Sequence, residues 1–183
     1  MRVIGGRLKG RKLISFKADH IRPTTDRVKE TVFNILMGVV EGSQVLDLFS
    51  GTGNLSVEAI SRGAASVEAV EYHRKSLQIM RQNFTALGIS DRIRIVASDV
   101  FEYLQKYQGQ PYDLILIDPP FTEKIADRVM AALASSRAVG PQTVVTIEYG
   151  RHESLQLRYD GLFRYNERQF GDKSAAFFRA SQV

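Results

Sequence analysis

The sequence predicts an α/β fold in which a mostly parallel sheet carries helices on both faces. From residue 44 onward, short apolar runs alternate with longer amphipathic stretches, a pattern typical of repeated strand-helix-strand units. Residues 114–117 are all apolar, as expected for a strand that is buried on both faces. The chain of 183 residues is long enough for one domain with a substantial core.

The first 20 residues are predicted to form a basic β-hairpin extension, and residues 21–183 the main domain. Two short apolar runs, residues 2–4 and 12–16, flank a turn that is rich in glycine and lysine, which indicates two paired strands.

A helix is predicted to follow Pro23. The polar residues Thr24, Thr25 and Asp26 can cap its first turn, and apolar residues then recur on one face. Gly38 or Gly42 is expected to end this helix.

The main domain is predicted to contain seven strands. The first five are residues 44–49, 66–71, 92–97, 112–118 and 143–149. Helices are predicted at residues 55–62, 77–87 and 123–135. The last two, residues 162–170 and 174–180, are predicted to form a closing hairpin around Gly171 and Asp172.

Composition excludes several kinds of chemistry. There is no cysteine, which removes disulfides, thiolate metal sites and cysteine nucleophiles. Histidines 20, 73 and 152 stand apart in the sequence, so we expect no metal site. The longest apolar run, residues 129–134, is too short to cross a bilayer, and the first residues lack an apolar signal region. We therefore expect a cytoplasmic protein with no membrane partner.

Positive charge is concentrated at the start of the chain. The net charge is +5, and residues 1–30 hold nine basic against three acidic side chains. Such a cluster favours a polyanion partner, because neutralised phosphates release counterions; a solvated surface that aids solubility is the alternative. The candidate RNA-binding residues are Arg2, Arg7, Lys9, Arg11, Lys12, Arg22 and Arg27.

A glycine turn follows the first strand of the main domain. Asp47 is followed by Phe49, Gly51 and Gly53 before the next helix, which places a ligand at the carboxyl edge of the sheet. A dinucleotide motif would have a third glycine where this chain has Ser56. A carboxylate here suits a ligand that carries an ammonium and a sulfonium; a plain tight turn is the alternative.

Two further acidic residues end the next strands. Glu71 lies where an acidic side chain accepts hydrogen bonds from ribose hydroxyls, although alone it would be a surface glutamate. Asp99 could accept a bond from an adenine amino group, or equally serve as an N-cap for the following helix.

The most specific motif is Asp118, Pro119, Pro120 and Phe121, directly after the buried strand. Two prolines fix the backbone, so the Asp118 carboxylate and the Pro119 carbonyl can together accept both hydrogens of an aromatic amine. That arrangement aims the nitrogen lone pair at an activated methyl group, while Phe121 stacks on the base. A rigid loop without catalytic function is the alternative.

Together these residues resemble the RsmD family, bacterial enzymes that methylate the N2 amine of one guanine in 16S ribosomal RNA. The resemblance rests on residues 2–6, 10–13, 22–30 with Phe33 and Asn34, the Asp47 and Asp118 motifs, and residues 170–172 with Phe177 and Phe178. Thr52, Asn54 and Leu55 depart from the family's smaller loop residues.

The resemblance implies a Rossmann-like class I methyltransferase fold with a seven-stranded sheet. It also implies S-adenosylmethionine as methyl donor, S-adenosylhomocysteine as product, and a small-subunit assembly intermediate as substrate. The stretch from Arg22 to Arg27, with Thr24, is implied to lie over the cofactor and the target base. We expect direct in-line transfer without a covalent enzyme intermediate.

Three other functions are compatible with parts of the sequence. A DNA adenine or cytosine amino-methyltransferase shares the Asp118 motif but generally needs a recognition domain that this length does not provide. A nicotinamide-dependent dehydrogenase is disfavoured by Ser56 and by the two prolines. A non-catalytic RNA-binding module would bind RNA with strong salt dependence and transfer nothing.

Overall fold

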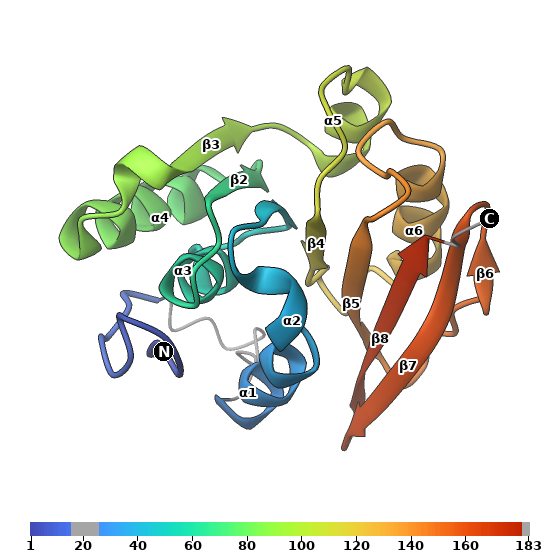
Figure 1. Cartoon of the computed structure of the whole chain (residues 1–183), viewed down its shortest axis with the longest axis horizontal. Helices are drawn as coiled ribbons and strands as arrows, with labels where there is room; N and C mark the ends of the chain where they lie inside the picture. The colour runs from blue at the N-terminus through green and yellow to red at the C-terminus, as the bar shows by residue number, and fades with distance from the viewer. Residues whose placement is uncertain (16–25, 181–183) are drawn as a thin grey trace.

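The structure is a computed structural model that describes residues 1–15 and 26–180. Its described part contains one eight-stranded sheet with the strand order β3-β2-β1-β4-β5-β8-β7-β6 (Figure 1). The strands are β1 (Gln44–Leu48), β2 (Ser66–Glu71), β3 (Ile93–Ala97), β4 (Leu114–Ile117), β5 (Val144–Gly150), β6 (Arg158–Tyr159), β7 (Leu162–Phe170) and β8 (Lys173–Ala180).

The predicted mostly parallel sheet is confirmed. Strands β1 to β5 pair in parallel, and β8 and β7 add to them in antiparallel order. The predicted number of seven strands is wrong, because β6 pairs with β7 as an eighth. Two residues, Arg158 and Tyr159, are too short a run to show any alternation in the sequence.

Helices cover both faces of the sheet, as predicted (Figure 1). They are α1 (Asp26–Ile35), α2 (Met37–Val40), α3 (Asn54–Ser61), α4 (Arg74–Leu87), α5 (Val100–Lys106) and α6 (Ala126–Ala134), with a short 3₁₀ turn at Ser90–Arg92. Side chains of α1, α3 and α4 share one apolar cluster, and those of α5 and α6 share the other. Alternate residues of the central strands point into the two clusters, which explains the continuous apolar run of β4.

Some predicted boundaries differ for local reasons. The helix expected from residue 123 begins at Ala126, because Lys124 has a left-handed φ of 49° that interrupts a helix. The helix expected after Pro23 ends at Ile35 and is followed by α2, and Gly42, with φ 73°, follows that second helix.

The predicted β-hairpin at the amino terminus is reduced to a short antiparallel contact. The Val3 amide donates to the Arg11 carbonyl at 2.9 Å and the Leu13 amide to the Met1 carbonyl at 3.0 Å, but residues 1–15 contain no strand. Within residues 1–15, one isolated antiparallel bridge joins Arg2 and Lys12, and Phe16 lies outside the described residues. Val3 and Leu13 are buried in the apolar cluster of α1, α3 and α4, so this basic arm is packed on the domain. The division into an extension and a main domain stays a prediction.

In the described ranges 1–15 and 26–180, none of the helices combines the length and apolar character that a bilayer span requires.

Candidate active site

The predicted cofactor residues of the first motif lie in a tight loop between β1 and α3. Phe49 adopts a left-handed φ of 59°, and Gly51 and Gly53 have φ values of 56° and 83°. A Cβ on Gly51 would meet only the Phe49 carbonyl at 3.9 Å, so this glycine leaves room beside the loop. A Cβ on Gly53 would lie 2.5 Å from the Phe84 ring of α4. Gly53 is therefore required for helix packing rather than for close approach to a ligand.

Asp47 is a buried carboxylate with one occupied oxygen. Its side chain is 1% exposed, and Ser56 donates a hydrogen bond to Oδ2 at 2.5 Å. Oδ1 is buried and has no hydrogen-bond partner among the described residues. Burial, and to a smaller extent the charge of Asp118, raise the pKa of Asp47 to about 7 against the lowering effect of the hydrogen bond from Ser56. A cationic ligand would satisfy this oxygen.

Glu71 ends β2 and holds the glycine loop in place. Its Oε2 accepts a hydrogen bond from the Gly51 amide at 2.8 Å, and its Oε1 accepts from the amides of Tyr72 and His73. Oε1 thus already accepts two bonds, whereas Oε2 can accept a second one, so Glu71 can also take one ribose hydroxyl. The sequence did not indicate its contact with Gly51, which joins residues 20 positions apart.

Asp99 caps α5. Its Oδ1 accepts bonds from the amides of Phe101 at 2.8 Å and Glu102 at 3.1 Å, so the N-cap interpretation left open by the sequence is confirmed. Contact with an adenine stays a prediction.

The Asp118 motif forms the loop between β4 and α6. The Asp118 amide bonds to the Leu48 carbonyl at 3.5 Å, which places the motif beside the end of β1. Pro119 is buried and Pro120 exposed, and the Pro120 carbonyl accepts a bond from the Glu123 amide at 3.1 Å. Asp118 therefore follows the carboxyl end of β4 next to the Asp47 loop, as the sequence predicts.

Residues distant in sequence support this loop and were not found from the sequence. Lys173 of β8 places its Nζ 3.8 Å from the Phe121 ring centroid and 3.8 Å from Oε2 of buried Glu148. Glu153 accepts bonds from the amides of Ala126 and Gly150. These contacts hold one face of Phe121 against a cation and tie the end of the loop to the end of β5.

The candidate RNA-binding residues lie in two places. Arg2, Arg7, Lys9, Arg11 and Lys12 are exposed on the arm, and Arg27 is exposed on α1. Arg2 forms an ion pair with Asp26 at 2.7 Å. Thr24 and Arg22 lie outside the described residues, so their predicted places over the cofactor and the base stay predictions.

S-adenosylmethionine fits the residues that surround this edge of the sheet. The unpartnered Oδ1 of Asp47 suits the positive charges of such a ligand, and Gly51 leaves the loop open beside it. Glu71 would hold the ribose, and Asp99 would lie beyond it.

Comparison with known proteins shows the family. The model of the family described as conserved hypothetical protein 95 matches residues 1–179. The chain belongs to this family. The protein named Ribosomal RNA small subunit methyltransferase D from Buchnera aphidicola subsp. Acyrthosiphon pisum is 34% identical over 154 residues, 84% of this chain and 80% of that protein. The Escherichia coli protein of the same name is 34% identical over 148 residues, 81% of this chain and 74% of that protein.

Solved structures agree with this membership. The Escherichia coli protein yhhF has a TM-score of 0.87 and 30% identity, and the match covers 98% of this chain and 97% of that chain. A candidate SAM-dependent methyltransferase from Streptococcus mutans has a TM-score of 0.71 over 88% of this chain and 50% of that chain; at 18% identity this likeness concerns the fold. The resemblance to the RsmD family and to the methyltransferase fold is confirmed.

Proposed function

We propose that this protein methylates the exocyclic N2 amine of a guanine in small-subunit 16S ribosomal RNA, with S-adenosylmethionine as donor. Relatives at 34% identity carry the name of a small-subunit ribosomal RNA methyltransferase. The exposed cations of the arm supply a surface for the RNA backbone.

The observation that carries this proposal is the pair of carboxylates at the ends of adjacent strands. Asp47 is the last but one residue of β1 and Asp118 directly follows β4, and they lie close enough for the charge of Asp118 to raise the pKa of Asp47. Asp47 is enclosed within the protein and keeps one oxygen for a cation, whereas Asp118 is only partly buried. This arrangement suits a cationic cofactor on one side and an amine substrate on the other.

The chain's own residues would orient the amine and remove its proton. Asp118 and the Pro119 carbonyl would accept the two N–H groups, which holds the nitrogen lone pair in one direction. Phe121 would stack on the base with the face that Lys173 does not occupy. The bound cofactor supplies an electrophilic methyl group. Asp118 need not be a strong base, because the amine becomes acidic only once it has been methylated.

The test is methyl transfer to ribosomal RNA from cells that lack the gene. Purified protein is incubated with small-subunit particles, with naked 16S RNA and with DNA, and the modified nucleoside is identified by mass spectrometry. Asp118→Ala should keep its affinity for S-adenosylhomocysteine in calorimetry and lose transfer by at least about 100-fold. Asp91→Asn, an exposed aspartate in the 3₁₀ turn, controls for loss of one negative charge.

Three results would contradict the proposal. Near-normal turnover in Asp118→Ala would remove the assigned role of the carboxylate. Transfer to DNA but not to RNA would favour a DNA amino-methyltransferase. RNA binding without any transfer would indicate a binding module.

A further inference from the structure

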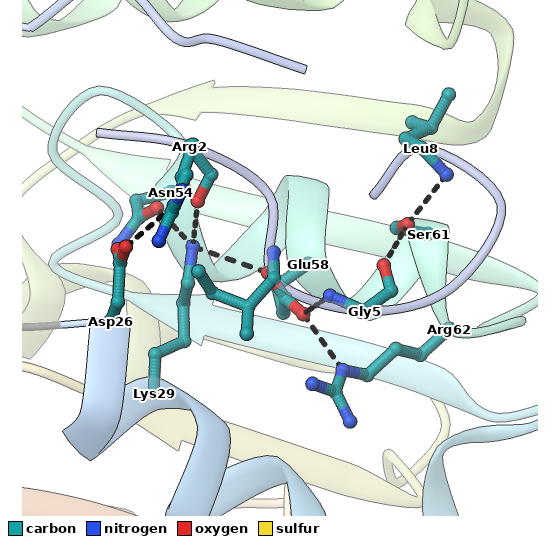
Figure 2. Close-up of polar contacts among 10 residues, drawn as sticks. Arg2, Gly5, Leu8, Asp26, Lys29, Asn54, Glu58, Ser61 and Arg62 are labelled. Carbon is teal, nitrogen blue, oxygen red and sulfur yellow. Dashed lines mark hydrogen bonds and ion pairs between the residues drawn. The ribbon is translucent and has the colours of Figure 1, made fainter. Parts of the chain in front are cut away.

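A buried ion pair joins the basic arm to the domain (Figure 2). Lys29 of α1 and Glu58 of α3 place Nζ and Oε2 3.2 Å apart, and their side chains are 1% and 0% exposed. Burial lowers the pKa of Lys29, and the charge of Glu58 offsets this only in part. Removing two charges from water is costly unless further hydrogen bonds satisfy them, so the other partners of this pair show what it holds.

Glu58 binds the backbone of the arm. Its Oε2 accepts a hydrogen bond from the Ile4 amide at 2.9 Å, and its Oε1 accepts from the Gly5 amide at 2.8 Å. Arg62, the C-cap residue of α3, donates to Oε1 at 2.7 Å. Since the Ile4 amide bonds to a side chain, it is not available for pairing between strands, and the antiparallel contact of residues 1–3 with residues 11–13 does not extend through Ile4.

Lys29 connects the arm to the glycine loop. Its Nζ donates to the Arg2 carbonyl at 2.7 Å and to Oδ1 of Asn54 at 2.8 Å. Asn54 is the first residue of α3 and directly follows Gly53. A single buried ammonium therefore contacts both the arm and the helix that begins at the cofactor loop (Figure 2). Asn54 is one of the residues at which the sequence departs from the family pattern, and this contact gives it a function.

Close packing along α3 and α4 leaves the arm one position. The amide of Leu8 donates to Oγ of Ser61 at 2.9 Å, and a Cβ on Gly6 would lie 1.8 Å from the Ser61 carbonyl oxygen. Near the other end of the arm, Asn83 of α4 bonds both the amide and the carbonyl of Ile14. The cations of the arm thus lie on a backbone that is fixed at several points.

We propose that Lys29 and Glu58 are positioning residues for the RNA substrate, which fix the basic arm beside the cofactor loop. This role rests on the proposed function, and it names the fixed basic arm as the surface along which the RNA is aligned. An arm that is ordered before binding loses less conformational entropy when the RNA binds. Lys29 is too deeply buried to contact a phosphate, so any effect of its substitution on RNA must pass through the arm.

The test compares Lys29→Met and Glu58→Gln with a matched exposed pair. Lys106 and Glu102 of α5 are 3.6 Å apart and 73% and 62% exposed, so Lys106→Met and Glu102→Gln remove the same charges away from the arm. The measurements are KM and kcat for methyl transfer to small-subunit RNA, the Kd for S-adenosylhomocysteine, and hydrogen exchange of the Ile4 and Gly5 amides.

Loss of the pair should raise the KM for RNA by about tenfold while kcat and the Kd for S-adenosylhomocysteine stay within about twofold. The Ile4 and Gly5 amides should lose protection in Glu58→Gln. Both control variants should match the wild type. If either variant of the pair fails to fold, Ser61→Ala should raise the KM by about threefold, because it removes the hydroxyl that accepts from the Leu8 amide and donates to the Gly5 carbonyl.

Unchanged KM together with unprotected Ile4 and Gly5 amides would overturn the proposal, because the arm would then be loose without consequence for RNA. Parallel loss of kcat and of cofactor affinity would also overturn it, since the pair would then support the whole site. If the wild type transfers no methyl group, the proposed function fails separately. The positioning role is then decided by the RNA affinity of the same variants and by its dependence on salt.

Discussion

The buried carboxylate of Asp47 provides a direct test of the site through pH. The folded protein keeps the Asp47 proton up to about pH 7, because burial raises the pKa of this group. The unfolded chain releases it near its ordinary pKa of 3.8. Since the folded state holds more protons between these two values, its stability falls as the pH rises through this window and is constant above it.

The size of the effect follows from the two pKa values. The interval between 3.8 and about 7 corresponds to about 4 kcal/mol, at about 1.4 kcal/mol for each tenfold change in proton affinity. Between pH 5 and pH 8.5 the wild type should lose about 3 kcal/mol through this group. Asp47→Asn has nearly the same shape and no titrating proton, so this part of the pH dependence should be absent.

The assay is urea unfolding of the cofactor-free protein at pH 5 and pH 8.5. The stability of Asp47→Asn relative to wild type should rise by about 3 kcal/mol between the two values, while its affinity for S-adenosylmethionine should fall. Asp91→Asn serves as the exposed control, with no change in the pH dependence. Equal pH dependence of Asp47→Asn and the wild type would refute the account of a buried, protonated carboxylate.

Three other substitutions test separate parts of the site. Gly53→Ala should destabilise the fold by at least about 1 kcal/mol, since the new Cβ would lie 2.5 Å from Phe84 on a residue with a φ of 83°. Urea unfolding measures this loss, and unchanged stability would argue against the packing role of Gly53. Phe121→Ala should lower kcat/KM for RNA by about 10-fold to 100-fold, whereas Phe121→Tyr should stay close to wild type. Equal rates in the wild type and both variants would exclude stacking of Phe121 on the base. Asp99→Ala should cost about 1 kcal/mol of stability, because the N-cap of α5 is lost. Calorimetry of this variant with S-adenosylhomocysteine tests whether Asp99 also contacts the cofactor, and unchanged affinity would reject that contact.

Much of the fold could be predicted because its signals are local. The apolar run of β4 and the alternation of short strands and helices indicate a parallel sheet without knowledge of any distant contact. The amino-terminal pairing is shorter than predicted, because the same local pattern did not show that Glu58 takes the Ile4 amide. A strand pattern states which residues can pair, but a buried carboxylate elsewhere in the chain can bind the same backbone groups.

The site was predictable where motif and strand end coincide. Asp47 lies near the carboxyl end of β1 and Asp118 directly follows β4, and these two strands are neighbours inside the sheet. Lys173 and Lys29 carry no such signal, because their functions depend on Phe121 and Glu58, which tertiary packing alone brings near them. For Gly53 the sequence indicated the right residue but the wrong reason, because this glycine is needed for packing against Phe84 of α4.

The short β6 has a consequence for the behaviour of the protein in concentrated solution. An outer strand with free backbone groups is a template on which a second molecule can add and begin an aggregate. Here the outermost strand has two residues, and the longer β7 behind it carries an irregularity between Arg164 and Asn166. Such a bend interrupts the straight row of donors and acceptors that intermolecular pairing requires. This border of the sheet is thus protected against fibrillar association.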